Sequence, residues 1–264
     1  MFGIYLLIGA FAGTMAGLLG IGGGIIVVPA LASVFLHYNI MPNSYVMHMA
    51  IGTSLAAMII TLISALRAHG RHGNVRWDLV KILLPGLMIG SVIGAIIAHA
   101  LSSAYLKTFF SIFLLLIAIR LLVVKTEEME GGELPSRLFM TFSAGTIGIL
   151  SSILGAGGGT MLIPFMMRCK VGIRQAAGTS VACGVSIGIV ATVSFMILGS
   201  TSVGLSLAWC TGYIYWPAFL GVAITSMIFA PIGTTLAHKL PTSVLKRVLG
   251  IFLVLIAIDM FFSH

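Results

Sequence analysis

The first 66 residues of this 264-residue chain contain no lysine, arginine, aspartate or glutamate. Across the whole chain 59% of residues are hydrophobic, 8% are charged and the mean hydropathy is +1.16, which leaves too little polar surface for a water-soluble protein. A helix needs about 20 apolar residues to cross the hydrocarbon layer. We therefore expect an all-α integral membrane protein, multi-pass in the cell membrane (plasma or inner), with the lipid bilayer as its surroundings.

Charges, prolines and glycines divide the chain into apolar segments. Two of these segments, 25–37 and 160–167, are too short to cross a bilayer alone. They suggest broken or re-entrant helices, which are tolerated at membrane depth only where protein or a water-filled cavity satisfies the backbone. About eight transmembrane helices are expected, at 2–19, 44–66, 79–101, 105–124, 137–154, 174–198, 214–238 and 242–262.

The two halves of the chain repeat the same motifs in the same order. The glycine-rich stretch 20–29 matches 155–164 at an offset of 135, and the Gly-Thr-Ser stretch 50–55 matches 176–181 at an offset of 126. Later stretches match at an offset of 139. Duplication is common among secondary transporters. The sequence therefore predicts two homologous four-helix repeats, 1–125 (the first copy) and 137–264 (the second copy), joined by a charged linker, 126–136.

The relation between the copies stays open at this level. A unit of four spans puts both copies in the same orientation, whereas a glycine-rich half-crossing would invert one of them. The charge rule points both ways, because a model with eight plain spans places Arg71 and Arg174 on opposite sides. We lean to a cytoplasmic N-terminus and leave the oligomeric state undecided.

The paired glycine runs are the strongest candidates for a binding site. Each glycine costs nearly 1 kcal/mol relative to alanine in a helix, so the chain is expected to break there, with Pro29 and Pro164 as structural helix-break residues. A broken helix offers unpaired N–H groups and a positive dipole end to an anion. The alternative is tight helix packing through small residues. The candidate residues are Gly22, Gly23, Gly24, Gly157, Gly158 and Gly159.

The Gly-Thr-Ser motifs place Thr53 and Ser54, and likewise Thr179 and Ser180, in apolar spans. Hydroxyl groups donate hydrogen bonds to an oxyanion without the desolvation penalty of a full charge. They bond equally well to carbonyls of their own helix, and the sequence does not separate these two interpretations.

Basic side chains occupy equivalent positions four residues before each Gly-Thr-Ser glycine. His48 and Arg174 could add positive charge at the edge of a cavity, although an interfacial anchor is the simpler interpretation of Arg174. His99 and His238 are also equivalent, and they could relay protons or cap helix carbonyls.

Several classes of function are excluded by what the chain lacks. The three cysteines show neither a CxxC pair nor metal-ligand spacing, so no metal or cofactor is expected. No catalytic signature is present, so we do not expect an enzyme. The formal net charge is +8, but basic residues fall mainly at segment ends, which favours membrane flanks and an anionic solute over a nucleic-acid partner.

With GxGGG and a proline followed by AxGTS, repeated after a charged linker, the chain resembles the sulfite exporter TauE/SafE family. This resemblance covers Gly13 to Ile258. It implies a carrier, more often an exporter, for sulfur-containing anions such as sulfite or sulfonates, and it carries over to the glycines, Gly-Thr-Ser residues and prolines named above. Arg174 fits the family pattern, whereas His48 is less typical of it.

The leading hypothesis is a secondary anion transporter with a midplane site between the two repeats, working by alternating access as the two repeats rock; coupling to protons stays open, with His99 and His238 as the candidates. The alternative is a channel or carrier for another small ion or metabolite.

Overall fold

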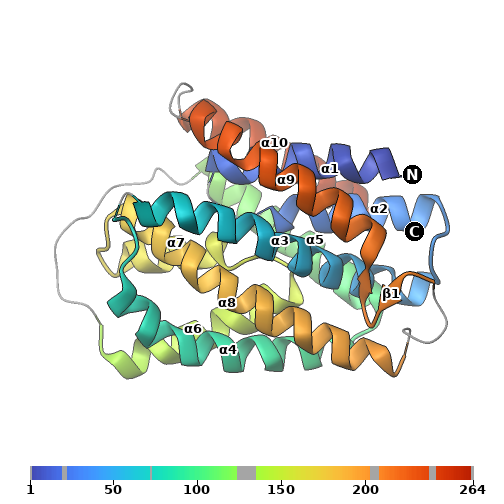
Figure 1. The fold of residues 1–264 in the computed structure, drawn as a ribbon, viewed down its shortest axis with the longest axis horizontal. Helices are drawn as coiled ribbons and strands as arrows, with labels where there is room; N and C mark the ends of the chain where they lie inside the picture. Colours follow the sequence, from blue (N-terminus) through green and yellow to red (C-terminus); the bar gives the residue numbers. More distant parts are fainter. Residues whose placement is uncertain are drawn as a thin grey trace.

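The computed structural model describes residues 2–19, 23–71, 73–123, 135–202, 208–237 and 242–262. Within these ranges the chain forms ten α-helices, a 3-10 helix (η1) and one short hairpin (Figure 1). The elements are α1 (Phe2–Leu19), α2 (Gly24–His37), η1 (Asn43–Tyr45), α3 (Val46–Arg71), α4 (Trp77–Ala100), α5 (Ser103–Val123), α6 (Arg137–Ile153), α7 (Gly159–Arg168), α8 (Ile173–Ser200), β1 (Cys210–Thr211), β2 (Ile214–Tyr215), α9 (Trp216–Ala237) and α10 (Thr242–Phe262).

The all-helical prediction is confirmed, and every predicted apolar segment corresponds to a helix, with α2 and α7 as the two short ones. Among the described residues, five helices are long and apolar enough to cross a membrane by length and composition. Four further apolar helices are shorter, so the count of eight crossings stays a prediction. The five are Asn43–Arg71, Trp77–Ala100, Ser103–Arg120, Ile173–Ser200 and Trp216–Gly233.

Two helix pairs pack through glycines, and each pair joins the two halves of the chain. Helix α1 lies along α9, where Gly13 sits against the backbone of Ser226. Helix α4 lies along α6, where Gly90 sits against the carbonyl of Gly145. A side chain at either glycine would overlap the facing backbone, so these contacts depend on small residues, as in other membrane helix pairs.

Helices α3 and α8 form the centre of the bundle and run antiparallel (Figure 1). Their direction follows from the contacts, since Gly184 faces Leu62 while Gly188, one turn further along α8, faces Ile59. Around them the core forms two clusters of buried side chains. The first lies mainly between α1, α2, α3, α5, α9 and α10 and includes residues of α4, α6 and α8, and the second lies between α4, α6, α7 and α8. The outer faces expose large apolar side chains, including Ile89, Leu116 and Ile197, as a lipid-facing surface requires.

Residues 126–134 of the predicted linker lie outside the described residues, so the boundaries 1–125 and 137–264 stay predictions. Both chain ends lie at the right of Figure 1.

We expect Gly90→Ala to lower the free energy of unfolding by about 1–3 kcal/mol, because the added methyl group must displace the α6 backbone. Gly70→Ala in α3 is the matched control, since nothing lies within 4 Å of the added methyl group. Thermal unfolding in detergent measures both variants. Equal melting temperatures for the two would contradict the close α4–α6 contact.

Candidate functional site

The two glycine-rich segments meet inside the protein. Residues 154–158 between α6 and α7 are not helical, and α2 begins at Gly24 after a gap in the described residues that includes Gly22. The α-carbon of Gly24 lies so close to the Gly155 carbonyl and to Ala156 that a side chain there would overlap them. The starts of α2 and α7, with their positive dipole ends, are thereby brought to the same central region.

Backbone conformation explains the glycines of the second segment. Gly155 and Gly158 have φ angles of +62° and +75°, a left-handed conformation that other residues adopt at a cost. The carbonyl of Gly157 lies against Gly184 of α8, and its α-carbon faces Met58 of α3. Helix α7 begins at Gly159. Pro29 and Pro164 lie inside α2 and α7, five residues after each start, so the interruptions are located at the glycines and not at the prolines.

The Gly-Thr halves of the two Gly-Thr-Ser motifs make reciprocal contacts between the copies. Thr53 Oγ1 accepts a hydrogen bond of 3.0 Å from the backbone N–H of Tyr215, just before α9. Thr179 Oγ1 accepts one of 3.0 Å from the backbone N–H of Arg76, just before α4. Tyr215 and Arg76 occupy equivalent positions in the repeat. Both threonine hydroxyls therefore hold the start of a helix in the other copy.

The preceding glycines make room for these bonds. A side chain at Gly52 would overlap the Tyr213 carbonyl, and one at Gly178 would overlap the Asn74 carbonyl. Tyr213 and Asn74 are again equivalent positions. The Gly-Thr pair thus makes the same packing contact in both halves of the chain.

The two serines of the motifs differ from each other. Ser54 Oγ donates a hydrogen bond of 3.2 Å to the carbonyl of Gly155. Ser180 is 1% exposed, and its Oγ has no hydrogen-bond partner within the described part of the chain. The residue equivalent to Gly155 is Gly20, which lies outside that part. Ser152 at the end of α6 is also fully buried without a partner among the described residues.

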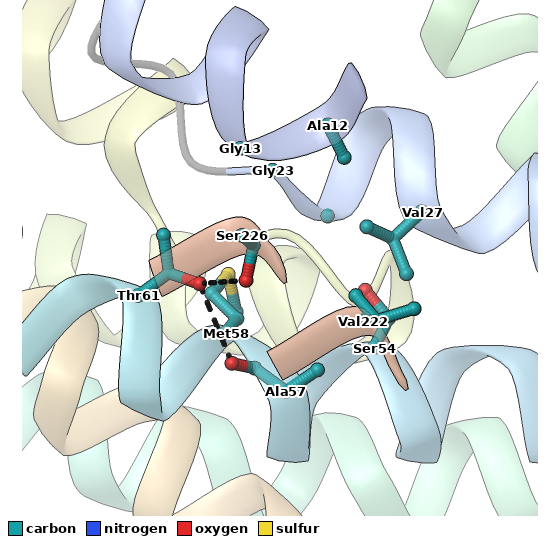
Figure 2. A pocket seen from close by; sticks show the side chains of 11 residues that line it. Ala12, Gly13, Gly23, Val27, Ser54, Ala57, Met58, Thr61, Val222 and Ser226 are labelled. Carbon is teal, nitrogen blue, oxygen red and sulfur yellow. Dashed lines mark hydrogen bonds between the residues drawn. The ribbon is translucent and has the colours of Figure 1, made fainter. Parts of the chain in front are cut away.

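A small cavity lies at the start of α2 (Figure 2). The space open to the centre of a water molecule is about 10 Å³, enough for about one water. No charged side chain lines it. Its walls come from α1, α2, α3 and α9: Ala12, Gly13, Gly23, Gly24, Val27, Ser54, Ala57, Met58, Thr61, Val222 and Ser226.

Figure 2 shows the hydroxyl groups of Thr61 and Ser226 pointing toward each other across this cavity. Their oxygens are 2.8 Å apart, and the bond links α3 of the first copy to α9 of the second. Sequence reasoning missed both residues because no motif contains them. Comparison of the halves could have found them, since the equivalent residues are the apolar Ile187 and Leu87.

The equivalent place in the second copy is filled. Positions matching Ala12, Ala57 and Val222 carry the larger side chains Ile147, Cys183 and Leu83. These larger side chains belong to the core cluster between α4, α6, α7 and α8, together with Leu162, Ile187 and Leu87. Cys183 is fully buried in that cluster. Of these two repeat-related places, the hollow one with hydroxyl groups lies between α1, α2 and α3 of the first half and α9 of the second.

The basic candidates lie away from the cavity. His48 is 3% exposed, six residues or about 9 Å before Ser54 along α3. Its Nε2 lies 3.0 Å from the carbonyl oxygens of both Ala98 and Leu101, at the end of α4. Arg174 is exposed near the start of α8. Neither residue lines the cavity.

Of the two proton-relay candidates, His99 is described, and His238 lies outside the described residues. His99 Nδ1 lies 2.8 Å from the hydroxyl of Tyr213. The described residues contain no group of three or more His, Cys, Asp or Glu side chains that could hold a metal ion.

We expect Thr53→Val and Thr179→Val each to destabilise the protein by about 1–3 kcal/mol, because each leaves a backbone N–H without its acceptor. Serine at either position keeps the hydroxyl acceptor, so Thr53→Ser and Thr179→Ser should lower the free energy of unfolding by less. Thr108→Val is the control, since the exposed Thr108 hydroxyl bonds only to its own helix, at Ala104. A melting temperature of Thr53→Val equal to that of this control would refute the contact between Thr53 and Tyr215.

Comparison with known proteins gives a consistent picture. The family model described as sulfite exporter TauE/SafE matches residues 5–260. A probable membrane transporter protein of Haemophilus influenzae is 35% identical over 257 residues, which cover 97% of this chain and 96% of that protein. The probable membrane transporter protein YunE of Bacillus subtilis is 26% identical, with 99% of this chain and 98% of YunE covered. No solved structure shows a significant match.

Proposed function

Because the chain belongs to the sulfite exporter TauE/SafE family, a family of multi-pass cell-membrane transporters, we propose that it exports a small sulfur-containing anion such as sulfite or an organosulfonate. The solute binds at the cavity between α1, α2, α3 and α9. Access to that cavity alternates between the two sides of the membrane.

The observation that carries this proposal is the chemistry of the cavity wall. The start of α2 lines the cavity at Gly23, Gly24 and Val27. The N–H groups of Ile26 and Val27 donate to the Gly23 carbonyl, which leaves the Gly24 N–H without an acceptor among the described residues. With the dipole of α2 and the hydroxyls of Thr61 and Ser226, which give up the carbonyls of Ala57 and Ala223 when they bind a solute, this N–H favours an oxyanion. Donors without a charge hold an anion less tightly than a buried cation would, so the transporter can also release the solute. They also avoid the free-energy cost of burying a charge.

An inverted relation between the two copies supports alternating access. The equivalent helices α3 and α8 run antiparallel, and the equivalent contacts of Thr53 and Thr179 are exchanged between copies. Helices α2 and α7 each add a partial crossing to their copy, and this addition gives the two copies opposite orientations in the membrane. Inverted repeats allow one site to face either side by exchange of two similar conformations.

Packing indicates which parts move. Each copy's first helix packs through glycines on the other copy's helix, α1 on α9 and α6 on α4. Rocking of one whole repeat against the other would break both contacts. We therefore place the moving boundary between the α1–α9 pair and α3, where the cavity lies and the Thr61–Ser226 bond crosses. With room for about one water, the cavity in this conformation is smaller than the proposed solute.

The distribution of basic residues assigns the sides. The starts of α4, α6 and α8 and the ends of α3 and α7 lie at the left of Figure 1. These helix ends carry Arg71, Arg76, Arg137, Arg168 and Arg174. Lys107, near the start of α5, lies toward the other end. The positive-inside rule makes the left end cytoplasmic and the end with Phe2 external, which reverses the lean drawn from the sequence.

Sulfite and organosulfonates should raise the melting temperature of the purified protein, because a bound solute stabilises the folded state by mass action. In proteoliposomes these anions should cross, whereas cations of similar size should not. Stabilisation by none of a panel of sulfur oxyanions, or flux of cations alone, would contradict the proposal and favour a channel or carrier for another ion.

The double variant Thr61→Ile with Ser226→Leu should abolish binding and flux, because it introduces the larger side chains of the equivalent residues, Ile187 and Leu87, into the cavity. Thr61→Val removes only the hydroxyl and should weaken binding by about tenfold or more, the range of a lost hydrogen bond. Ile228→Leu on the exposed face of α9 is the control. A double variant that folds and keeps wild-type flux would exclude this cavity as the solute site.

A further inference from the structure

A cluster of aromatic rings joins the two copies at the end of the bundle that carries the α8–α9 hairpin. The ring of His48 stacks on Tyr213, with centroids 5.0 Å apart and planes 29° from parallel. His99 bonds to the Tyr213 hydroxyl at 2.8 Å. Tyr45 and Phe195 contact the same tyrosine ring at 6.3 and 6.0 Å. The starts of α3 and η1 and the end of α4 are thereby held against the hairpin and α8.

The hydrogen bonds of His48 define its protonation state in this conformation. Nε2 lies 3.0 Å from two carbonyl oxygens, of Ala98 and Leu101, so this nitrogen must carry the hydrogen and donate it. In a neutral ring Nδ1 is then an unprotonated acceptor. Nδ1 is buried and has no partner within the described part of the chain. It is a free lone pair on an imidazole, and a proton bound there makes the ring an imidazolium with two donors.

A proton on Nδ1 is incompatible with the packed cluster. It would create a buried N–H without an acceptor and a buried positive charge, both of which cost free energy. No carboxylate is available among the described residues to offset that charge: Asp78 begins α4, at the opposite end from His99, and Asp259 lies on α10 in a groove with α1 and α2.

The other groups around His48 also disfavour its protonation. His99 on α4 and Lys107 on α5 are basic, and η1 and the hairpin contribute the phenols of Tyr45 and Tyr213. Burial raises the pKa of Tyr213, so this phenol stays neutral below pH 8. The described part of α8 that reaches this end, 185–202, has no charged residue. Acid therefore weakens the cluster, and neutral or higher pH strengthens it.

The opposite end of the bundle lacks this device. The residues equivalent to His48 and Tyr213 are Arg174 and Asn74, and Arg174 is exposed and carries a permanent charge. Within the described residues, the stacked histidine and tyrosine have no counterpart at these equivalent positions, and the end with the cluster is the one proposed above to be external.

We propose that Nδ1 of His48 is a proton-binding site, and that a proton taken there from the external solution releases Tyr213 and the hairpin and opens that end of the transporter. This inference rests on the alternating-access proposal above. No bond other than N–H forms or breaks, and the proton returns to the same solution when the cluster closes again. The pH of the external solution thereby biases whether this end is open.

Two tryptophans make the hairpin observable. Trp209 and Trp216 flank it, and Trp77, the third tryptophan of the chain, begins α4 at the other end. In a Trp77→Phe background, solute-free protein in lipid nanodiscs should show one transition in tryptophan emission between pH 8 and pH 5. His48→Gln should lose it, because glutamine keeps a donor near the Nε2 position and does not titrate. His37→Gln, an exposed histidine at the same end, should keep it.

A second variant keeps the test decisive if His48→Gln does not fold. His99→Gln removes a neighbouring basic group, so the transition should persist and move to higher pH. Absence of the transition in wild type, its survival in His48→Gln, or its loss in His99→Gln or His37→Gln would each overturn the proposal. The fluorescence measurement uses no solute, so a missing pH transition would contradict the role of His48 and leave the proposal of anion export untouched. Conversely, if no anion binds, the pH transition still tests the role of His48.

Discussion

A helix interrupted inside a membrane leaves backbone N–H and C=O groups that lipid cannot satisfy, and the rest of this structure depends on how that constraint is met. The chain interrupts a helix twice and brings the two interruptions together. Gly24 lies directly against the Gly155 carbonyl, and Ser54 donates to the same carbonyl. The central helices α3 and α8, which carry the Gly-Thr-Ser motifs, then surround this junction.

Within the duplicated Gly-Thr-Ser motif, the threonine makes the same contact in both halves of the chain, whereas the serine does not. The threonine accepts a hydrogen bond from the N–H of the residue just before α9 or α4. The surroundings of the serine differ: Ser54 has small and hydroxylated neighbours from α1, α3 and α9, whereas the equivalent positions around Ser180 carry leucine, isoleucine and cysteine from α4, α6 and α8. Under the proposed function, the hollow place is the single solute position, and it lies at the proposed moving boundary between the α1–α9 pair and α3.

Much of the helical content was predictable from the sequence, because uncharged apolar segments of fixed length and glycine runs mark helices and their interruptions directly. The two short segments are α2 and α7, as the lengths of 25–37 and 160–167 indicated. The pairing of α1 with α9 and of α4 with α6 was not predictable, since it depends on how far the chain returns after each interruption. The role of His48 was missed for a similar reason: its partners are carbonyls at the end of α4, which no motif records.

The central claim is that a sulfur oxyanion binds where α2 begins, beside Thr61 and Ser226. The most direct test is an experimental structure of the protein with selenite, the selenium analogue of sulfite, located by its anomalous scattering. We predict one strong peak within hydrogen-bond distance of the first turn of α2 and of these two hydroxyls. A peak instead among Ile147, Leu162 and Cys183, or at the exposed Arg174 with none in the cavity, would contradict the account.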